Sequence, residues 1–455
     1  MEIALIFPRY KYPSGDTPLG LLYIATYLKE KTTHNVDVFD TTFHKDKSKL
    51  NKALHNKKYD IVGISLMTTM LRDADWISRV IKGYSPETKV IWGGPHPTVL
   101  PELSLGCRDV DAIVIGEGEE TWLDLVKKKG VFRGVNGIWY KEGKDIIANE
   151  ARPFIDDLDK LPFPDHELVD LDSYFKHWFQ LDSVARNLKG INLISSRGCP
   201  YQCSFCQPTL NRLFGTRIRK RSPENIVEEL EFWKEKRHID AFMFQDDTLI
   251  CDKPWVSSIC DAILEKKLNL KWGCNVRANL VDYKIFSKMK KAGLRKVFMG
   301  IESGSQRVLD DVYQKGITIR QVKDAVTILK SLNLKVQGYF MLGAPTETIE
   351  EAKKTIRFAR QLDIDEATFS ITTPLPHTHL YEKTKHLISE DVADFDYYKT
   401  PVYKGEAVID KVKLQKLKRK ALLSFYLAPK RVISTLGAFA TPSAIKKSVA
   451  KLKRF

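Results

Sequence analysis

Long apolar runs and abundant cysteine are both missing from this chain of 455 residues. No stretch approaches the roughly 18 uninterrupted apolar residues that a transmembrane helix needs, so none is expected. The apolar run at the N-terminus breaks at Pro8 and has no basic flank, which argues against a secretory signal peptide. The seven cysteines lack the even pairing of a secreted disulfide scaffold, so we expect a reducing, cytoplasmic environment.

Acidic residues are missing from the C-terminal end. From Lys411 to Phe455 there are thirteen Lys or Arg and no Asp or Glu, within a net charge of +16 for the whole chain. Most of the excess charge therefore lies in this tail, and the rest of the chain is close to neutral. Nothing in the sequence resembles a nucleic-acid-binding domain, so basic charge alone does not predict a nucleic-acid partner.

The N-terminal part, residues 1–135, alternates short apolar runs with segments of helical periodicity. The apolar runs fall at 2–7, 36–40, 60–66, 89–94 and 111–119. This alternation predicts a doubly wound, Rossmann-like α/β domain of parallel strands. Such domains bind ligands at the carboxyl ends of their strands. Glycines, small hydroxyl residues and one histidine follow the strands here, where a backbone must come close to a ligand.

Strand signals resume after a different connecting segment. Residues 136–188 predict a small hairpin and an extended, proline-punctuated linker. Over 189–385, amphipathic helices separate six strand candidates, which predicts a partial (β/α)6 barrel. These strand candidates are 190–196, 241–247, 271–276, 296–303, 335–342 and 366–376. Residues 386–455 lack strand signals and predict a helical, basic extension.

Cys199, Cys203 and Cys206 lie together in "SRGCPYQCSFCQ" (196–207), directly after the first strand of the predicted barrel. A four-cysteine zinc site would need a second CxxC pair, and the other cysteines are isolated in the sequence. Three thiolates leave a metal centre one protein ligand short, which favours an iron–sulfur cluster with one open iron. The alternative is three buried thiols that pack as small apolar side chains.

The CxxxCxxC spacing resembles the signature of the radical SAM enzymes. The segments "FQDDT" (244–248), "MGIESG" (299–304), "GYFMLGAPTET" (338–348) and "PLPHTHLY" (374–381) resemble the motifs that follow later strands in that family. The resemblance implies a [4Fe–4S] cluster on the three cysteines, with S-adenosylmethionine (SAM) at the open iron. His377 departs from the family, which usually has glycine there. The implied SAM contacts are Phe205, Asp246, Asp247, Arg277, Glu302, Ser303, Gly343 and Pro374.

Each motif residue also has an ordinary structural alternative. Asp246 and Asp247 could cap a helix, and Glu302 could be a common loop carboxylate. Arg277 could form a surface ion pair of little energetic value. Their shared position at the strand ends of one predicted barrel favours the functional interpretation.

An α/β domain ahead of such a barrel resembles the cobalamin-binding domain of the cobalamin-dependent radical SAM enzymes. The match lies in "TPLGLLYIA", "DIVGISLMTT", "VIWGGPHPTVLPE" and "VIGEGEET". The D-x-H-x-x-G motif that gives cobalt an axial histidine in other cobalamin domains is absent. His96 is therefore expected to bond the backbone or the nucleotide tail instead, and the alternative for the whole domain is a module that binds nothing. The implied cobalamin contacts are Thr17, Leu19, Gly20, Ser65, Met67, Thr68, Gly93, Gly94, His96, Gly116, Glu117, Gly118 and Glu119.

The basic tail divides at Pro429. Residues 411–428 contain enough apolar side chains to pack on the barrel. For 430–455 we favour contact with an anionic membrane surface, which would place the cytoplasmic protein at the inner membrane face; the alternative is a solvated helix.

The resemblance implies an enzyme, with C-methyl transfer as the leading reaction. A 5′-deoxyadenosyl radical would abstract hydrogen from an unactivated carbon, and methylcobalamin would deliver a methyl group to a small-molecule, lipid-like or secondary-metabolite substrate. We expect a monomer that receives electrons from a flavodoxin or ferredoxin. The alternatives are cyclisation or oxidation, as in the anaerobic porphyrin-ring cyclases, and a non-catalytic corrinoid or redox sensor. Methylthiolation of tRNA is disfavoured, because the N-terminal domain holds only Cys107 and not a second cysteine triad.

Overall fold

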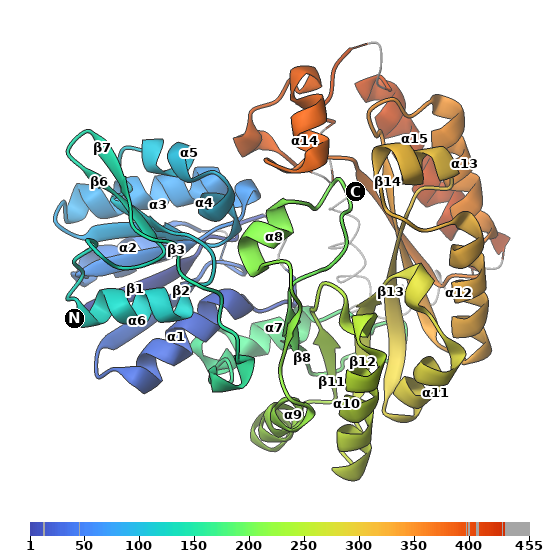
Figure 1. Cartoon of the computed structure of the whole chain (residues 1–455), viewed down its shortest axis with the longest axis horizontal. Coiled ribbons are helices and arrows are strands. Elements are labelled where there is room, and N and C mark those ends of the chain that lie inside the picture. The colour runs from blue at the N-terminus through green and yellow to red at the C-terminus, as the bar shows by residue number, and fades with distance from the viewer. Residues whose placement is uncertain are drawn as a thin grey trace.

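The structure, a computed structural model, describes residues 1–11, 14–44, 46–396, 398, 401–405, 409–429 and 431–432. Two sheets of largely parallel strands lie side by side, the first built from the N-terminal part of the chain (Figure 1). Among the described residues, no helix is long and apolar enough to cross a membrane. Apart from Arg431 and Val432, the segment 430–455, with its expected membrane contact, lies outside the described residues.

The N-terminal sheet has seven strands in the described part of the chain, in the order β2-β1-β3-β4-β5-β6-β7. The first five pair in parallel, in the order of a doubly wound fold, which confirms the predicted class. The predicted hairpin is β6–β7, and it extends this sheet as two antiparallel strands. The strands are β1 (Glu2–Phe7), β2 (Asn35–Asp40), β3 (Ile61–Ser65), β4 (Lys89–Gly93), β5 (Ala112–Val114), β6 (Ile138–Glu142) and β7 (Asp145–Ala148).

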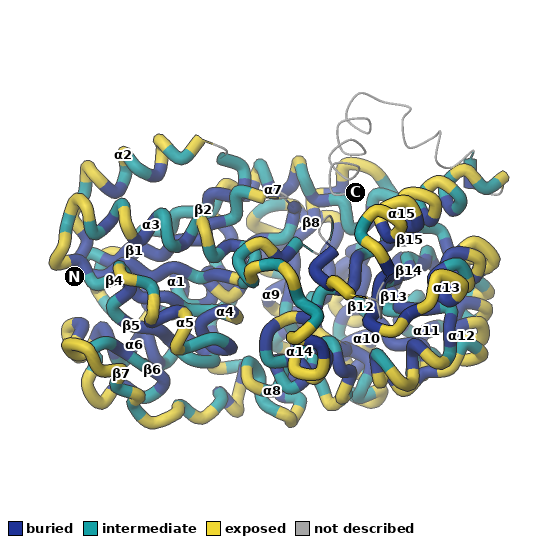
Figure 2. The backbone as a smooth tube through the Cα atoms, turned by 90° about the horizontal axis from the view of Figure 1, so that it is seen from above, coloured by how far each residue is buried: buried dark blue, intermediate teal, exposed yellow. Residues whose placement is uncertain are grey.

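Helices cover both faces of this sheet (Figure 1). On one face lie α1 (Leu19–Lys31) and α6 (Glu119–Lys127), and on the other lie α2 (Ser48–Asn56), α3 (Leu71–Tyr84), α4 (Pro95–Val99) and α5 (Pro101–Gly106). The strands β1, β3, β4 and β5 are continuous apolar runs because helices cover both of their faces, as the buried interior in Figure 2 shows, whereas the edge strands β2 and β7 are partly exposed. Gly63 of β3 makes room for Trp122 of α6, since a Cβ there would stand 2.5 Å from the indole.

The second sheet confirms the partial barrel. In the described residues it has six parallel strands in the order β15-β14-β13-β12-β11-β8, and β8 does not pair with β15, so the barrel stays open. Its strands are β8 (Gly190–Leu193), β11 (Ala241–Phe244), β12 (Lys271–Val276), β13 (Leu294–Glu302), β14 (Lys335–Leu342) and β15 (Glu366–Ile371). The outer helices are α9 (Pro223–Arg237), α10 (Lys253–Glu265), α11 (Tyr283–Lys291), α12 (Ile319–Ser331) and α13 (Ile349–Gln361).

Short elements surround the mouth of the barrel. A two-stranded ribbon of β9 (Ser196–Arg197) and β10 (Arg219–Lys220) pairs antiparallel beside the cysteines. The helices α8 (Thr209–Phe214) and α14 (His379–Thr384) also lie in this region, whereas α7 (Leu171–His177) lies beside the last turn of α9, where Arg237 binds Asp172. The helix α4 of the N-terminal domain contacts α8, so the two domains meet next to the cysteine-bearing segment.

The last described helix, α15 (Lys411–Tyr426), packs against α13 and β15. Its inner face buries Leu414, Leu417, Ala421 and Phe425, which confirms the predicted packing of 411–428 on the barrel. Arg431 holds the far end by donating hydrogen bonds to three backbone carbonyls between β15 and α13, and its guanidinium lies 4.0 Å from the centre of the Phe425 ring.

The packing of α15 predicts a sharp contrast between two of its residues. Phe425→Ala should lower the free energy of unfolding of the barrel by about 3–5 kcal/mol, because it leaves a cavity under the helix. Leu423→Ala, whose side chain is 48% exposed on the same helix, should change it by no more than about 0.5 kcal/mol. Chemical denaturation monitored by circular dichroism measures both, and equal losses would contradict the packing of α15.

Candidate functional site

The three clustered cysteines lie in one loop, residues 198–207, which we call the cysteine loop. Neighbouring segments hold it by its backbone: Ser204 donates its N–H to the carbonyl of Tyr313 over 2.9 Å, and Leu380 donates to the carbonyl of Ser204 over 2.8 Å. None of the seven cysteines, all within described residues, forms a disulfide. The thiols are therefore available as ligands on a loop fixed from two sides.

Cationic side chains face these thiols. The Nη1 of Arg277 lies 3.4 Å from the Sγ of Cys203, and its guanidinium stacks 3.9 Å from the centre of the Tyr201 ring. Arg277 is buried, which contradicts the alternative of a surface ion pair. Burial raises the pKa of Cys206 well above its usual range and the neighbouring Cys203 adds to this, so a metal must displace the thiol proton.

This donor set fits an iron–sulfur cluster better than a single metal ion. Within the described residues, no three His, Cys, Asp or Glu side chains converge closely enough to hold one ion. A cubane cluster does not need such convergence, since each cysteine binds a different iron. Three free thiols on one loop, with a buried guanidinium beside them, match that requirement.

The two neighbouring aspartates after β11 have different environments. Asp246 is buried and accepts hydrogen bonds from the Ser195 hydroxyl (2.8 Å), the Ser196 hydroxyl (2.5 Å) and the Ser195 N–H (3.2 Å), so it ties the ends of β8 and β11 together. Asp247 accepts no hydrogen bond from any described residue, and its side chain is accessible from the barrel mouth. Surrounding protein atoms nevertheless desolvate it and, with the charge of Asp246, raise its pKa to about 6. Asp247 is the aspartate free to meet a cation.

Glu302 ends β13 with a positive φ of 65° and accepts a hydrogen bond from Lys315 over 2.7 Å. The Nζ of Lys315 also lies 5.6 Å from the centre of the Phe205 ring, and Phe205 stacks edge-on against Tyr313 at 5.4 Å. Lys315 was not predicted, because no motif marks it and only the fold places it between Glu302 and the cysteine loop.

The remaining predicted SAM residues line later strand ends. Gly343 has a φ of 82°, and a Cβ there would fall 2.4 Å from the Leu414 side chain of α15. Pro374 and Ser303 are buried, and the Ser303 hydroxyl lies 3.1 Å from that of Thr355. His377 has a φ of 59°, a backbone that suits the family's usual glycine, and its Nδ1 lies 3.8 Å from a carboxylate oxygen of Glu382.

The predicted cobalamin residues come together at the carboxyl edge of the N-terminal sheet. They lie in the four loops after β1, β3, β4 and β5, which we call the cobalamin edge. Thr17, Leu19 and Gly20 follow β1; Ser65, Met67 and Thr68 close β3; Gly93, Gly94 and His96 follow β4; and Gly116, Glu117, Gly118 and Glu119 follow β5. A Cβ at Gly20 or Gly116 would meet no described atom within 4 Å, so these glycines leave space that suits a bulky flat ligand.

His96 lies 1% exposed in the loop after β4. Its Nδ1 is 3.1 Å from the Thr68 hydroxyl, and its Nε2 has no hydrogen-bond partner among the described residues. Burial lowers the pKa of His96 to about 4, so the ring is neutral at physiological pH. The Nε2 of His96 is therefore a buried polar atom at the cobalamin edge without a hydrogen-bond partner among the described residues. A bound cofactor could supply that partner, which supports the fit of cobalamin to this edge.

Glu117 and Glu119 are engaged in buried ion pairs with the barrel domain. Arg197 donates to Glu117 over 2.7 Å and to Glu119 over 2.6 Å, and Arg219 donates to both oxygens of Glu117 over 2.8 and 2.9 Å. We call these four residues the interdomain clasp. Burial would raise the pKa of Glu117, but the hydrogen bond from Arg219 and the charge of Arg197 hold that pKa below its usual range. This bond between the domains was not predicted, because Arg197 and Arg219 lie some eighty to a hundred residues after the glutamates.

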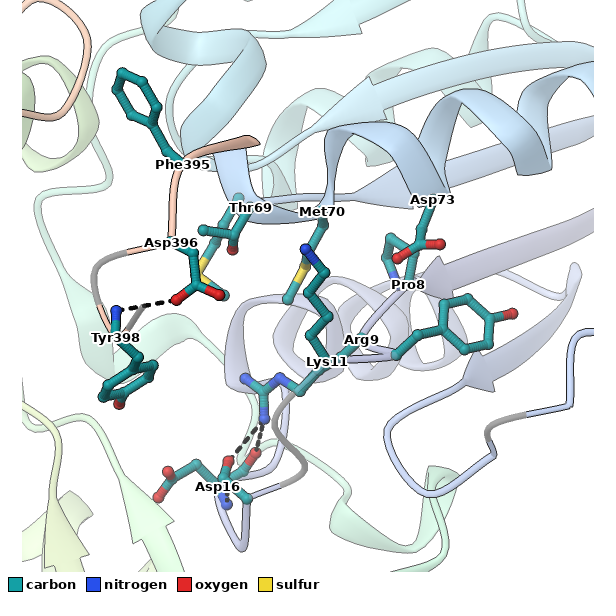
Figure 3. A pocket seen from close by; sticks show the side chains of 13 residues that line it. Pro8, Arg9, Lys11, Asp16, Thr69, Met70, Asp73, Phe395, Asp396 and Tyr398 are labelled. Atoms are coloured by element: carbon teal, nitrogen blue, oxygen red, sulfur yellow. Dashed lines mark hydrogen bonds between the residues drawn. The ribbon is translucent and has the colours of Figure 1, made fainter. Parts of the chain in front are cut away.

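A pocket, which we call the interdomain pocket, opens between the N-terminal domain and the C-terminal extension, beside the cobalamin edge (Figure 3). Arg9 and Asp16, from the loop after β1, form one wall, and Phe395 and Tyr398 approach from the C-terminal part of the chain. Arg9 donates to the Ser14 hydroxyl and to the Asp16 carbonyl. The Asp16 carboxylate accepts hydrogen bonds from the amides of three residues on the barrel side: Gln180, Asn192 and Gln245. The pocket is therefore lined by the N-terminal domain and the C-terminal extension, and Asp16 links it to the barrel side.

The burial of His96 predicts a pH-dependent stability. A histidine whose pKa is lower in the folded state binds fewer protons there than in the unfolded state, so acid favours unfolding. Between about pH 7 and about pH 5, wild-type protein should lose about 2 kcal/mol more than His96→Gln. Denaturant titrations at the two pH values measure this, with the exposed His386→Gln as control. Equal pH slopes for wild type and His96→Gln would contradict it.

Comparisons with known proteins agree with this geometry. The B12 binding domain matches residues 13–126 and the Radical SAM superfamily matches residues 193–359. An uncharacterized methyltransferase of Pyrococcus horikoshii is 36% identical over 96% of this chain and 95% of its own length. An anaerobic magnesium-protoporphyrin IX monomethyl ester cyclase of Rubrivivax gelatinosus is 29% identical over 90% of this chain and 74% of its own length.

The fold also matches a solved structure. The radical S-adenosylmethionine methyltransferase TsrM from Kitasatospora setae, solved with its tryptophan substrate and a SAM analogue, superimposes with a TM-score of 0.71 at 18% identity, over 85% of this chain and 76% of that one. The cofactors of this chain are accordingly a [4Fe–4S] cluster, SAM and cobalamin. The chain belongs to the cobalamin-binding radical SAM enzymes, with a B12-binding domain ahead of its radical SAM domain.

Proposed function

We propose that this enzyme is a C-methyltransferase that methylates an unactivated carbon of a small molecule. The observation that carries the proposal is the adjacency of the two cofactor regions: Arg197, two residues before Cys199, binds Glu117 and Glu119 of the cobalamin edge. When bound, the cluster with SAM would supply a 5′-deoxyadenosyl radical, and cobalamin would supply the methyl group. Radical formation and methyl donation would then occur side by side in one chain.

We propose the following roles for the chain's own residues. The three cysteines of the cysteine loop hold the cluster, and Arg277 offsets thiolate charge at Cys203. Asp247 and Glu302 orient the amino and ribose or methionyl parts of SAM, with Phe205 beside the adenine. Gly343 lets its strand end pack against Leu414 of α15. The predicted cobalamin residues other than Glu117 and Glu119, which bind Arg197 and Arg219, hold the corrin, and His96 offers its free Nε2 to the nucleotide tail.

The interdomain pocket is our candidate for the substrate site. Charged side chains such as Arg9, Lys11 and Asp16 line it together with Met70 and Phe395 (Figure 3). This mixture favours a substrate with polar groups on an apolar frame rather than a purely hydrocarbon lipid. The polar groups would fix its orientation, while the apolar side chains would exclude water from the radical.

Two further partners belong to the proposal. A flavodoxin or ferredoxin would reduce the cluster. Contact with an anionic membrane is supported by the outer face of α15, where Lys416, Arg419 and Lys420 accompany the exposed Leu423 and Leu427. Retention of full affinity for anionic vesicles by a Lys416→Gln/Arg419→Gln/Lys420→Gln variant, which keeps the buried face of α15, would remove this support.

Cyclisation or oxidation without methyl transfer is the second candidate. The observation in its favour is the similarity of the Rubrivivax cyclase over nine-tenths of this chain. Both reactions would share the cluster, SAM and cobalamin, so the residues at the cofactor sites do not separate them.

Methyl-labelled SAM tests the proposed function without a known substrate. Anaerobically reconstituted protein with bound, reduced cobalamin should transfer labelled methyl to the corrinoid, since the methyl donor must be regenerated. Mass spectrometry of the released corrinoid measures the label. Reductant-dependent formation of 5′-deoxyadenosine with no labelled corrinoid would instead support the cyclase-type reaction, and the absence of both products would contradict an enzyme.

The environment of Asp247 predicts how SAM binding depends on pH. The amino group of SAM should donate a stronger hydrogen bond to the ionised carboxylate of Asp247, whose pKa is raised to about 6 by burial and by Asp246, than to its protonated form. SAM affinity of cluster-loaded protein should fall about fourfold from about pH 8 to about pH 5.5 as Asp247 gains its proton. Asp247→Asn should bind more weakly and nearly independently of pH in equilibrium dialysis, whereas Asp261→Asn, on the outer surface of α10, should keep the wild-type profile. If the SAM affinity of the Asp247→Asn variant still fell with pH as in the wild type, this role of Asp247 would be excluded.

A further inference from the structure

Four charged side chains of the interdomain clasp are buried where the two domains meet. Glu117 and Glu119 come from the loop and first turn after β5, and Arg197 and Arg219 come from the paired strands β9 and β10. All four are between 3% and 9% exposed. Arg219 also donates to the backbone carbonyls of Ile155 (2.6 Å) and Phe214 (2.9 Å), and the N–H of Ile155 donates to Glu117 over 2.8 Å. Both Nη atoms of each arginine in the clasp therefore have a defined acceptor.

Stability alone is a weak explanation for this arrangement. Removing charges from water carries a penalty that their attraction only partly offsets, so an apolar contact of similar size often stabilises a protein equally well. What the ion pairs add is direction, since the planar guanidinium of Arg197 meets one carboxylate oxygen of each glutamate at a fixed angle. The geometry therefore fixes how the two loops lie relative to each other.

On the barrel side, the clasp leads directly into the cysteine loop. Arg197 is followed by Gly198 and then by Cys199. Gly198 has a φ of 106°, and a Cβ there would stand 2.8 Å from the carbonyl oxygen of Arg217. The chain between the guanidinium and the first cysteine thus has one tight conformation, and a shift of Arg197 must move Cys199.

On the other side, the clasp leads into the cobalamin edge. Gly116 directly precedes Glu117, and its N–H donates to the Thr98 hydroxyl over 3.0 Å. Thr98 lies on α4, the helix that also carries His96. A short path of covalent and hydrogen bonds therefore joins the loop that holds the cluster to two of the loops that hold cobalamin.

Another interdomain contact does not share this property. The carboxylate of Asp16 binds the amides of Asn192, Gln245 and Gln180, which lie on β8, next to the end of β11 and in the linker. It joins the domains without touching the cysteine loop. The clasp, in contrast, is placed to transmit the state of one cofactor loop to the other.

We propose that Arg197, with Glu117 and Glu119, is a positioning element that couples the two cofactor sites, so that assembly of the cluster raises the affinity of the enzyme for cobalamin. The proposal rests on the cofactor assignments and on neither the substrate nor the reaction. Ordering of Cys199 by the cluster would hold Arg197 in the position that organises the loop of Glu117 and Glu119. Coupling of this kind is reciprocal, so bound cobalamin would raise the affinity of the cysteine loop for the cluster by the same factor.

The test measures the dissociation constant of hydroxocobalamin for the full chain, under anaerobic conditions, before and after reconstitution of the cluster. For wild type, the affinity should rise about fivefold or more on cluster assembly. Glu119→Gln removes one ion pair and leaves Arg197 bonded to Glu117, and Arg197→Lys keeps the charge but loses the fork. In both variants, the cobalamin affinities measured before and after reconstitution of the cluster should differ by less than about twofold.

A matched control comes from the barrel. Glu229 forms an equally buried ion pair with Arg221, within the barrel domain. Glu229→Gln should keep the wild-type ratio of the two cobalamin affinities. General destabilisation would lower both affinities of a variant and leave their ratio unchanged, so the ratio separates positioning from a structural role.

The outcomes are distinct. A wild-type ratio near one, or a clasp variant that folds and keeps the wild-type ratio, would overturn the coupling and leave the proposed methyl transfer intact. Thermal melting shows which variants fold, and Glu119→Gln keeps the test available if Arg197→Lys does not. Loss of labelled methyl transfer with a normal ratio would overturn the proposed function and leave the coupling intact. A wild-type protein that binds no cobalamin would overturn both.

Discussion

The buried ion pairs between Arg197 and the carboxylates of Glu117 and Glu119 are the constraint on which the functional geometry depends. Two α/β domains with separate cores could be joined in many orientations, since apolar packing specifies contact area more strongly than angle. Buried charges are less tolerant, because each unpaired group in the interior is strongly destabilising. The clasp therefore limits the domains to arrangements in which the cysteine loop lies beside the cobalamin edge.

Much of the architecture could be predicted from the sequence because it depends on local patterns. Runs such as residues 2–7 and 335–342 are β1 and β14 with the predicted bounds. The strand β1 is apolar along nearly its whole length because both of its faces are covered, whereas β14 alternates buried and half-buried residues. The hairpin at 138–148 was predicted as an element, but its attachment to the edge of β5 was not. That pairing depends on backbone groups that carry no sequence signal. The packing of α15 followed from its apolar side chains, which the barrel buries.

The functional site was only partly predictable. Short motifs marked the cysteine loop and the strand ends, since their residues are adjacent in the chain. The separate roles of Asp246 and Asp247 were not predictable, because the serines that bind Asp246 lie some fifty residues earlier. Lys315, beside Glu302, and Arg219, beside Glu117, have no motif and reach the site through the fold alone. The motifs therefore identified the cysteine loop and the strand ends, whereas residues distant in the sequence could be assigned to the site only from the folded structure.

The central claim is that one chain holds an iron–sulfur cluster and cobalamin on adjoining loops. The most direct measurement is the absorption spectrum of the anaerobically purified and reconstituted protein, with iron, sulfide and cobalt determined on the same sample. The account predicts overlapping cluster and corrinoid absorption, with about four irons and one cobalt per chain. A protein that takes up only one of the two cofactors, with the other absent at saturating supply, would contradict it.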